Sequence, residues 1–308
     1  MTDHVLFTLF GLPVTCYAAC LVLAAVLSVL ALLFSCRREN QETMLLFSVL
    51  TVPFCVIGAR IVYCLANFDL YISSPADALY FWQGGYAIWG AIFGGAAACL
   101  MTAALRGMPC LRVMDEAAPA AALMIALSRA SELFSGQGYG LSVEKESLCF
   151  FPLAVCNEYD EWHYAVFMLE ALYALVILFI LLSGKKALPE GTKARRMIIL
   201  YSAGQILLEN LRCDEYLNWV FGYLRISQLI SALVLLSLLL GGLKKKKARG
   251  RSFVLPVLLF LLLAGVVVGA QFAMDKLWWM PVWACYAVVL LCSIGFGAIT
   301  FRVVQEKV

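Results

Sequence analysis

Long apolar segments, separated by short polar ones, run along almost the whole chain. A helix needs about 20 such residues to cross the ~30 Å hydrocarbon core of a bilayer. The nine segments that approach this length lie at residues 12–34, 44–66, 86–105, 115–135, 164–183, 197–211, 225–243, 253–273 and 281–301. The first has no basic stretch before it, so we expect a retained helix rather than a cleaved signal. The pattern predicts an all-α, polytopic helical membrane bundle.

Composition supports the membrane interpretation. Of the 308 residues, 63% are hydrophobic and only 14% are charged, whereas globular domains carry about 25% charged residues. The 12 cysteines are scattered and form no C-x-x-C pair, so we expect no zinc site. Cys149 and Cys156 share a polar loop, where they either form a disulfide or remain free thiols.

The basic residues predict an orientation. Most of the 23 lysines and arginines fall in alternate loops, near residues 37–38, 106–112, 185–196, 244–251 and 302–307. The loops between them are acidic, notably residues 67–85 and 136–164. The positive-inside rule then puts the N-terminus outside and the C-terminus in the cytoplasm, which requires an odd number of crossings. The cluster at residues 244–251 either anchors this topology or binds anionic lipid head groups.

Some charged residues instead fall inside the predicted helices or at their outer ends. They are Arg60, Arg129, Arg212, Arg225, Glu132, Glu170 and Glu209. A charge at the bilayer centre costs about 2.5–3.5 kcal/mol on insertion scales, so charges gathered at one depth predict a polar pocket there, open towards the outer leaflet. Interhelical ion pairs that hold the bundle together are the alternative, and the two are compatible. Arg129 and Glu132 are three residues apart, so they can meet on one helix face.

Two further stretches border this predicted pocket. The glycines of Gly84–Gly95 allow either close helix packing or close approach of the backbone to a ligand. The long loop at residues 136–164 carries aromatic side chains among acidic ones. Aromatic residues favour the head-group level of a membrane, so we expect this loop to form a small cap over the pocket.

Several stretches, in order, resemble motifs of the prolipoprotein diacylglyceryl transferase family. Val14–Ala18 keeps the family's tyrosine as Tyr17, and Ile57–Tyr63 resembles its G-A-R-x-x-Y motif through Arg60. Gly84–Gly95 resembles its glycine-rich stretch, with Trp89 where the family has histidine. The match covers roughly residues 10–243, and residues 252–308 add two helices beyond it.

The family's signature resembles residues 128–140. Arg129 and Gly140 are kept, while Glu132 and Ser135 replace asparagines and Gln137 replaces a glutamate. Two later motifs are matched as well. Glu170 falls at the glutamate of one, and Tyr201–Arg212 resembles Y-x-x-x-R-x-x-x-E-x-x-R, with Glu209 and Arg212 kept and Gln205 replacing the arginine.

This resemblance implies a domain organisation and an activity. Residues 1–243 would form a seven-helix transferase-like membrane domain, and residues 244–308 a basic linker with two extra transmembrane helices. The family moves a diacylglyceryl group from phosphatidylglycerol to the lipobox cysteine thiol of a lipoprotein precursor, at the outer face of the bacterial plasma membrane. We therefore expect a phospholipid and a lipoprotein precursor as partners, and no cofactor, metal or nucleic acid.

The resemblance also implies roles for individual residues. Arg129 would hold a lipid phosphate, because a guanidinium binds phosphate oxygens bidentately. The acceptor must lose a proton, and Glu132, Glu170 or Glu209 would act as the general base after burial raises its pKa. His163 is a further candidate base, with a plain surface residue as the alternative. The remaining substrate-binding candidates are Tyr17, Arg60, Trp89, Ser135, Gln137, Gly140, Gln205 and Arg212.

The replaced motif residues leave three hypotheses open. The chain performs the same reaction with a rearranged site, uses a different lipid donor or acceptor, or binds lipid without turnover. A transporter or channel is disfavoured, because the sequence has no internal repeat and its intramembrane charges do not run through the full bilayer thickness.

Overall fold

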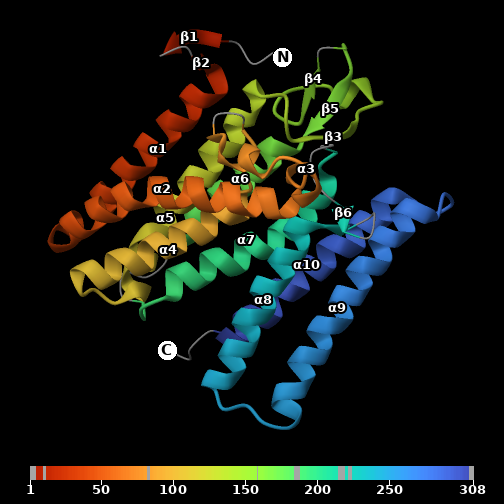
Figure 1. Cartoon of the computed structure of the whole chain (residues 1–308). Helices are drawn as coiled ribbons and strands as arrows, with labels where there is room; N and C mark the ends of the chain where they lie inside the picture. Colours follow the sequence, from red (N-terminus) through yellow and green to blue (C-terminus); the bar gives the residue numbers. More distant parts are fainter. Residues whose placement is uncertain are drawn as a thin grey trace. The chain divides into compact units, whose positions relative to one another are not determined.

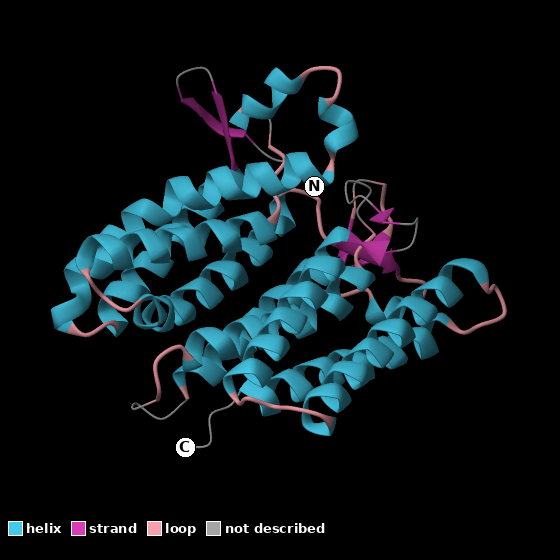
Figure 2. Ribbon diagram, turned by 60° about the horizontal axis from the view of Figure 1, so that its bottom comes forward, coloured by secondary structure: helices cyan, strands magenta, loops and turns pink. Residues whose placement is uncertain are grey.

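A computed structural model describes residues 5–9, 12–81, 84–157, 159–183, 188–213, 219–220 and 224–304. These residues are mostly helical (Figures 1 and 2). They divide into two compact units. Unit 1 contains Met1–Ala24, Ala122–Ser183 and Arg195–Val308, and unit 2 contains Ala25–Ala121 and Gly184–Ala194. The predicted division into a transferase-like domain at residues 1–243 and a C-terminal region at residues 244–308 stays a prediction.

The described part of the chain contains ten α-helices (Figure 1). They are α1 (Cys16–Ser35), α2 (Gln41–Ala66), α3 (Phe68–Tyr71), α4 (Ile88–Arg106), α5 (Cys110–Ser131), α6 (Val166–Leu182), α7 (Thr192–Leu211), α8 (Ile226–Lys245), α9 (Arg251–Lys276) and α10 (Val282–Val304). Each of the predicted long segments overlaps one of these helices, and only the short α3 was not predicted.

Among the described residues, six helical segments are long and apolar enough to cross a membrane, which confirms a multi-pass membrane protein. They are Cys16–Ser35, Arg38–Ala66, Ile88–Arg106, Ile226–Lys245, Arg251–Lys276 and Val282–Val304. Helices α5, α6 and α7 are not among them. The 17 residues of α6 are few for a span, and charged side chains interrupt α5 and α7.

Helix α7 begins five residues before the predicted start, at Thr192. Within unit 2 a carboxylate from another helix caps it: Asp115 of α5 accepts hydrogen bonds from the backbone N–H groups of Gly191 (2.6 Å) and Ala194 (2.8 Å). The first N–H groups of a helix have no partner inside the helix, and a negative charge there also favours the helix dipole. The sequence showed no local cap, so the earlier start was not predicted.

In the part of the chain that the structure describes, small antiparallel sheets, three in number, interrupt the helical pattern (Figure 2). One pairs β1 (Val5–Leu9) with β2 (Leu12–Thr15), a second has the order β3 (Tyr139–Ser142), β5 (Trp162–Ala165), β4 (Ala154–Cys156), and a third pairs β6 (Trp219–Val220) with β7 (Leu224–Arg225). Strands this short leave no readable alternation in the sequence, so they were missed. The second sheet is built from the long loop that we expected to form a cap, and Cys149 and Cys156 in it are free thiols.

In unit 2, glycines let α2 and α4 pack backbone against backbone. A Cβ atom on Gly94 would lie 2.2 Å from the carbonyl oxygen of Phe54, and one on Gly90 would lie 2.2 Å from that of Gly58. No side chain fits at such distances, because Cβ atoms essentially never approach a heavy atom so closely. Gly90 and Gly94 of the third predicted helix therefore serve helix packing.

In unit 1, the helices α7 to α10 share one core. Buried side chains of all four helices contribute, including Ile199, Leu235, Phe260 and Phe296. The rings of Phe260 and Phe296 lie 4.6 Å apart and tilted, a favourable aromatic contact. The two C-terminal helices thus pack directly on α7 and α8.

We predict that Gly94→Ala destabilises the protein by roughly 1–3 kcal/mol, the usual cost of overpacking a tight contact. The measurement is the thermal unfolding midpoint of the purified protein in detergent. Gly265→Ala is the matched control, because a Cβ at this α9 position meets no heavy atom within 4 Å. Equal midpoints for the two variants would contradict the packing of α2 on α4.

Candidate functional site

A closed ring of two arginines and two glutamates is buried in unit 1. Arg129 pairs with Glu132 through Nη1 and Oε1, and with Glu170 through Nε and Oε2 at 2.6 Å. Arg212 pairs with the same two carboxylates, at 3.1 Å to Glu132 Oε2 and 3.0 Å to Glu170 Oε2. The four side chains are only 3–11% exposed. We call this set the four-charge ring.

Local structure brings the four residues together. Arg129 lies in the last turn of α5, and the 3-10 turn Glu132–Phe134 continues it, so the i, i+3 spacing sets both side chains on one face. Glu170 is on α6, and Arg212 follows the last residue of α7. The sequence predicted the first pair. It did not predict that Arg212 and Glu170 would close the ring.

The glycine-rich turn after Glu132 lies against the ring. Gly138 has φ +76°, and a Cβ there would lie 2.6 Å from Glu132 Oε2 and 3.4 Å from Arg212 Nη2. Its carbonyl accepts a hydrogen bond from the N–H of Phe167 at 3.1 Å, which ties the turn to α6. The position therefore requires glycine for both its backbone conformation and its lack of a side chain.

A second group of polar residues adjoins the ring. Arg225, the residue before α8, donates to the carbonyl of Arg212 and lies 3.8 Å from Glu209 Oε1. Gln205 donates to Glu209 Oε2 at 2.9 Å. The ring and this group together contain three arginines and three glutamates, so their formal charges balance.

The polar contacts continue into the C-terminal helices. Gln228 Oε1 accepts hydrogen bonds from the backbone N–H of Arg225 (3.2 Å) and from Gln271 Nε2 of α9 (2.9 Å). Gln228 itself donates to the carbonyl of Ile206 at 2.9 Å. Gln271 is 2% exposed. Sequence reasoning missed it, although a lone amide inside the apolar run at residues 253–273 was the available signal.

Arg60 is engaged within unit 2. Its guanidinium donates to the backbone carbonyls of Asp77 (2.8 Å), Ala78 (2.9 Å), Gly84 and Gly85 (3.3 Å). It thereby fastens the connection between α2 and α4 to the end of α2. These contacts give the arginine a structural role, and its predicted role in substrate binding stays a prediction.

The other predicted site residues differ in position and burial. Trp89 is 2% exposed in unit 2, with its ring 6.0 Å from that of Phe93. Tyr17 is partly buried in the first turn of α1. In unit 1, Ser135 Oγ donates to the carbonyl of Glu132 at 3.1 Å, while Gln137 is exposed.

His163 belongs to the small sheet. Its Nδ1 lies 3.2 Å from the carbonyl oxygen of Gly140, and its Nε2 lies 3.2 Å from the side-chain nitrogen of Asn157. Nε2 also lies 3.5 Å from Glu161 Oε2. The ring also stacks on Tyr139 at 5.9 Å. The contacts of His163 fix the fold of the sheet around Gly140.

The arrangement of the carboxylates limits which of them can accept a proton. Both oxygens of Glu132 are paired with arginines. By contrast, Glu170 Oε1 and Glu209 Oε1 are buried and make no hydrogen bond within the described residues. In these same residues, no group of three or more histidine, cysteine, aspartate or glutamate side chains is arranged to hold a metal ion. The site thus offers guanidinium and carboxylate chemistry.

Comparison with known proteins gives the family. The model for "Prolipoprotein diacylglyceryl transferase" matches residues 4–244. The chain belongs to the prolipoprotein diacylglyceryl transferase family. A phosphatidylglycerol–prolipoprotein diacylglyceryl transferase of Parasynechococcus marenigrum is 32% identical over 223 residues, which cover 68% of this chain and 79% of that protein.

Two further relatives carry the same name. The protein of Streptococcus mutans is 27% identical over 76% of this chain and 92% of its own length. That of Clostridium novyi is 29% identical over 74% of this chain and 90% of its own length. The family match ends at residue 244, so α10 and α9, the helix that carries Gln271, lie beyond it.

We predict that Arg212→Met lowers the free energy of unfolding by roughly 3–5 kcal/mol, because it leaves two buried carboxylates short of a partner. Arg106→Met is the control, since Arg106 is 41% exposed and pairs with Glu42 at the surface, where ion pairs contribute about 0–1 kcal/mol. Denaturant titration of both purified variants measures the difference. Equal stability of the two variants would refute the structural importance of the ring.

Proposed function

We propose that this protein transfers a diacylglyceryl group from a phosphatidylglycerol-like phospholipid to an acceptor such as the lipobox cysteine thiol of a lipoprotein precursor. Family membership over most of the chain supports this reaction. The observation that carries it is the pair of buried guanidinium groups, Arg129 and Arg212, at positions that match arginines of the family's motifs.

We further propose the orientation that the basic loops indicate. All nine long helices cross the bacterial plasma membrane, with the N-terminus outside and the C-terminus in the cytoplasm. In this arrangement the junction between α5 and the Gly138 turn faces the outer leaflet. The four-charge ring then lies near the outer surface, where a lipoprotein precursor and the lipid donor are both within reach.

The chemistry assigns a task to each charged group. A thiolate attacks the glyceryl carbon of the donor, the S–C bond forms, and the C–O bond to phosphate breaks, so that glycerophosphate leaves. Arg129 and Arg212 would bind that phosphate and stabilise the charge that develops on it. Buried guanidinium groups suit this task because they stay charged out of water.

The thiol proton needs an acceptor. Glu209 is our first choice of general base, because Oε1 makes no hydrogen bond in the described part of the chain and has only the longer ion pair with Arg225 at 3.8 Å, while Gln205 holds Oε2. Glu132 is a less suitable base, since both its oxygens are paired with arginines. His163 is the second choice, through Nε2. Tyr17, Trp89, Ser135, Gln137 and Gly140 remain proposed substrate contacts.

The charge balance of the ring favours a second candidate function. A phosphodiester adds a negative charge where two guanidinium groups are already matched by Glu132 and Glu170. The family has a neutral amide where this chain has Glu132. A divergent member that uses another lipid donor, or that binds lipid without turnover, fits this closed ring.

We expect the chain to add a diacylglyceryl group to a reporter lipoprotein in cells depleted of their own transferase, measured as a mass increase. Arg129→Ala should reduce the transfer roughly 100-fold or more, because removing one charge-stabilising donor costs about that much. Lys276→Ala serves as the control, since Lys276 is 61% exposed and pairs with its neighbour Asp275. No mass increase with the unaltered protein would exclude the standard reaction.

Glu132→Asn tests the second candidate. It removes one carboxylate from the ring, so we expect roughly tenfold more phosphatidylglycerol bound per protein, because like charges brought together cost several kcal/mol. Native mass spectrometry of protein purified from phosphatidylglycerol-containing membranes measures the bound lipid, with Glu144→Gln in the exposed loop as the control. Less bound lipid in Glu132→Asn would show that the carboxylate helps binding and would refute the closed-ring explanation.

Restoring the family residues tests, by activity, whether the replaced motif residues limit the standard transfer reaction. Trp89→His combined with Gln205→Arg should raise transfer to the reporter lipoprotein if the replacements limit the standard chemistry. Gln205 contacts Glu209, so an arginine there would add a cation beside that carboxylate. Each single variant is the control for the pair. Unchanged or lower transfer in the double variant would exclude these two positions as the limiting ones.

A further inference from the structure

Gln271 is a buried polar side chain in an apolar helix, and it lies outside the part of the chain that the family match covers. It stands near the end of α9, whereas the match ends at residue 244. A buried amide is costly unless it is hydrogen-bonded. The partner of Gln271 therefore shows what this residue does.

That partner is Gln228 in the first turn of α8. Gln271 Nε2 donates to Gln228 Oε1 at 2.9 Å, while Gln271 Oε1 has no hydrogen-bond partner among the described residues. Gln228 Oε1 also accepts the backbone N–H of Arg225 at 3.2 Å, and its Nε2 donates to the carbonyl of Ile206 at 2.9 Å. A carboxamide can be turned end for end, and a donor from Gln271 favours the orientation in which Oε1 faces Arg225.

The amide pair adds little to the attachment of α9 to its neighbours. The core that α7 to α10 share is apolar, with buried side chains such as Leu235 and Phe260. A buried hydrogen bond between two side chains contributes little net stability, because two apolar residues of the same shape would pack as well. The contact between Gln271 and Gln228 therefore contributes orientation rather than attachment.

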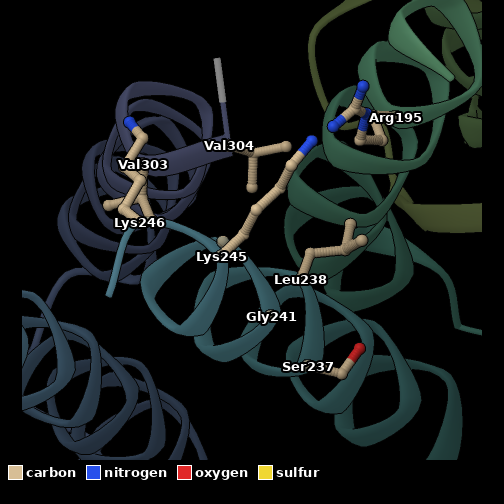
Figure 3. Close-up of a pocket in the computed structure, with 9 residues that line it drawn as sticks. Arg195, Ser237, Leu238, Gly241, Lys245, Lys246, Val303 and Val304 are labelled. Carbon is tan, nitrogen blue, oxygen red and sulfur yellow. The ribbon is translucent and has the colours of Figure 1, made fainter. Parts of the chain in front are cut away.

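The C-terminal half of α8 does not supply this orientation on every face. A hollow of about 690 Å³ lies between this half and the ends of α7 and α10 (Figure 3). Ser237 and Gly241 border the hollow and are exposed, and a Cβ on Gly241 would meet no heavy atom within 4 Å. Close packing does not hold α8 on this face, so the polar contacts of its first turn carry more of the orientation.

Those contacts hold two groups of the candidate site. Arg225 donates to the carbonyl of Arg212 and lies 3.8 Å from Glu209 Oε1. Ile206 precedes Glu209 by about one turn of α7, so the hydrogen bond from Gln228 to the carbonyl of Ile206 fixes the turn that carries Glu209. Gln228 thus connects Arg225 with the part of α7 that it faces.

We propose that Gln271 is a positioning residue for the transfer reaction, which acts through Gln228 to hold Arg225 beside Glu209. The inference rests on the proposed function, in which Glu209 takes the thiol proton. A general base has to keep its distance and direction to that proton, and a displacement of about 1 Å caused by a change far from the chemistry can cost roughly 100-fold in rate. Helix α9 then completes a site that the family-matched part of the chain begins.

Steady-state kinetics of the purified full-length protein tests this role, with phosphatidylglycerol as the donor and a synthetic lipobox peptide as the acceptor. Gln271→Met keeps the length of the side chain but removes the hydrogen-bond donor. We expect kcat to fall roughly tenfold, part of the about 10²–10⁴ that a general base contributes. KM for phosphatidylglycerol should stay unchanged, because Arg129 and Arg212, the proposed phosphate ligands, keep their ion pairs with Glu132 and Glu170.

Two controls separate positioning from stability. Phe260→Leu weakens the core on the same helix, and Ser293→Ala removes a buried hydroxyl of α10 that donates within its own helix, to the carbonyl of Val289. Both variants should keep kcat, even where their thermal unfolding midpoints fall as far as that of Gln271→Met. In a Gln228→Met background, Gln271→Met should cause no further loss, because effects that pass through one contact are not additive.

Hydrogen–deuterium exchange gives a readout that does not require activity. The backbone N–H of Arg225 is bonded to Gln228 Oε1. In Gln271→Met the peptide that contains residues 224–228 should exchange roughly tenfold faster, because a weakened hydrogen bond of ordinary strength makes local opening easier by about that factor. Phe260→Leu and Ser293→Ala should leave the exchange of this peptide unchanged.

The outcomes separate this inference from the proposed function. A lower kcat at unchanged KM, absent from both controls and coupled to Gln228, supports the positioning role. Unchanged kcat in Gln271→Met overturns it, as does a raised KM alone or an additive loss in the Gln228→Met background. If the unaltered protein transfers nothing, the proposed function fails by itself; faster exchange around Arg225 then supports Gln271 as the residue that holds it, and unchanged exchange overturns this.

Discussion

The structure of unit 1 depends on the matching of buried charge. Arg212 follows α7, yet its guanidinium pairs with Glu132 after α5 and with Glu170 on α6. A buried charge without a partner is far more costly than a missing apolar contact. The ends of α5 and α7 therefore have to meet α6 where all four side chains of the ring are paired. The Gly138 turn rests on the ring, and the small sheet around His163 rests on that turn.

The ion pairs of the four-charge ring oppose the binding of a lipid phosphate, which the family's reaction implies. Guanidinium groups bind phosphate best when no carboxylate already holds them. In this chain Glu132 and Glu170 hold both Arg129 and Arg212. In the proposed reaction a donor phosphate would therefore have to compete with the internal ion pairs, so that the interactions that stabilise the fold would lower the affinity for an anionic substrate. In the proposed reaction, phosphate binding and stability would therefore draw on one set of arginines, and Glu132 is the replaced motif residue that pairs with both of them.

Sequence patterns predicted the helices because apolar runs of this length leave few alternatives in a membrane. They also predicted that Arg129 meets Glu132, since that contact is local. The partners of Arg212 and Arg60 could not be predicted, because they are distant in sequence and depend on which helix ends meet. Short strands, and the cap that Asp115 supplies to α7, were missed for the same reason: the information lies in tertiary contacts rather than in local periodicity.

The two C-terminal helices belong to this network as well as to the core. A glutamine buried in an apolar helix has to find a polar partner, and Gln271 finds it in Gln228, which also accepts the backbone N–H of Arg225. Arg225 in turn holds the carbonyl of Arg212 and lies beside Glu209. A continuous chain of polar contacts thus joins α9, beyond the end of the family match, to the four-charge ring. Helices that served only to anchor the chain would have no need of a buried amide at this point.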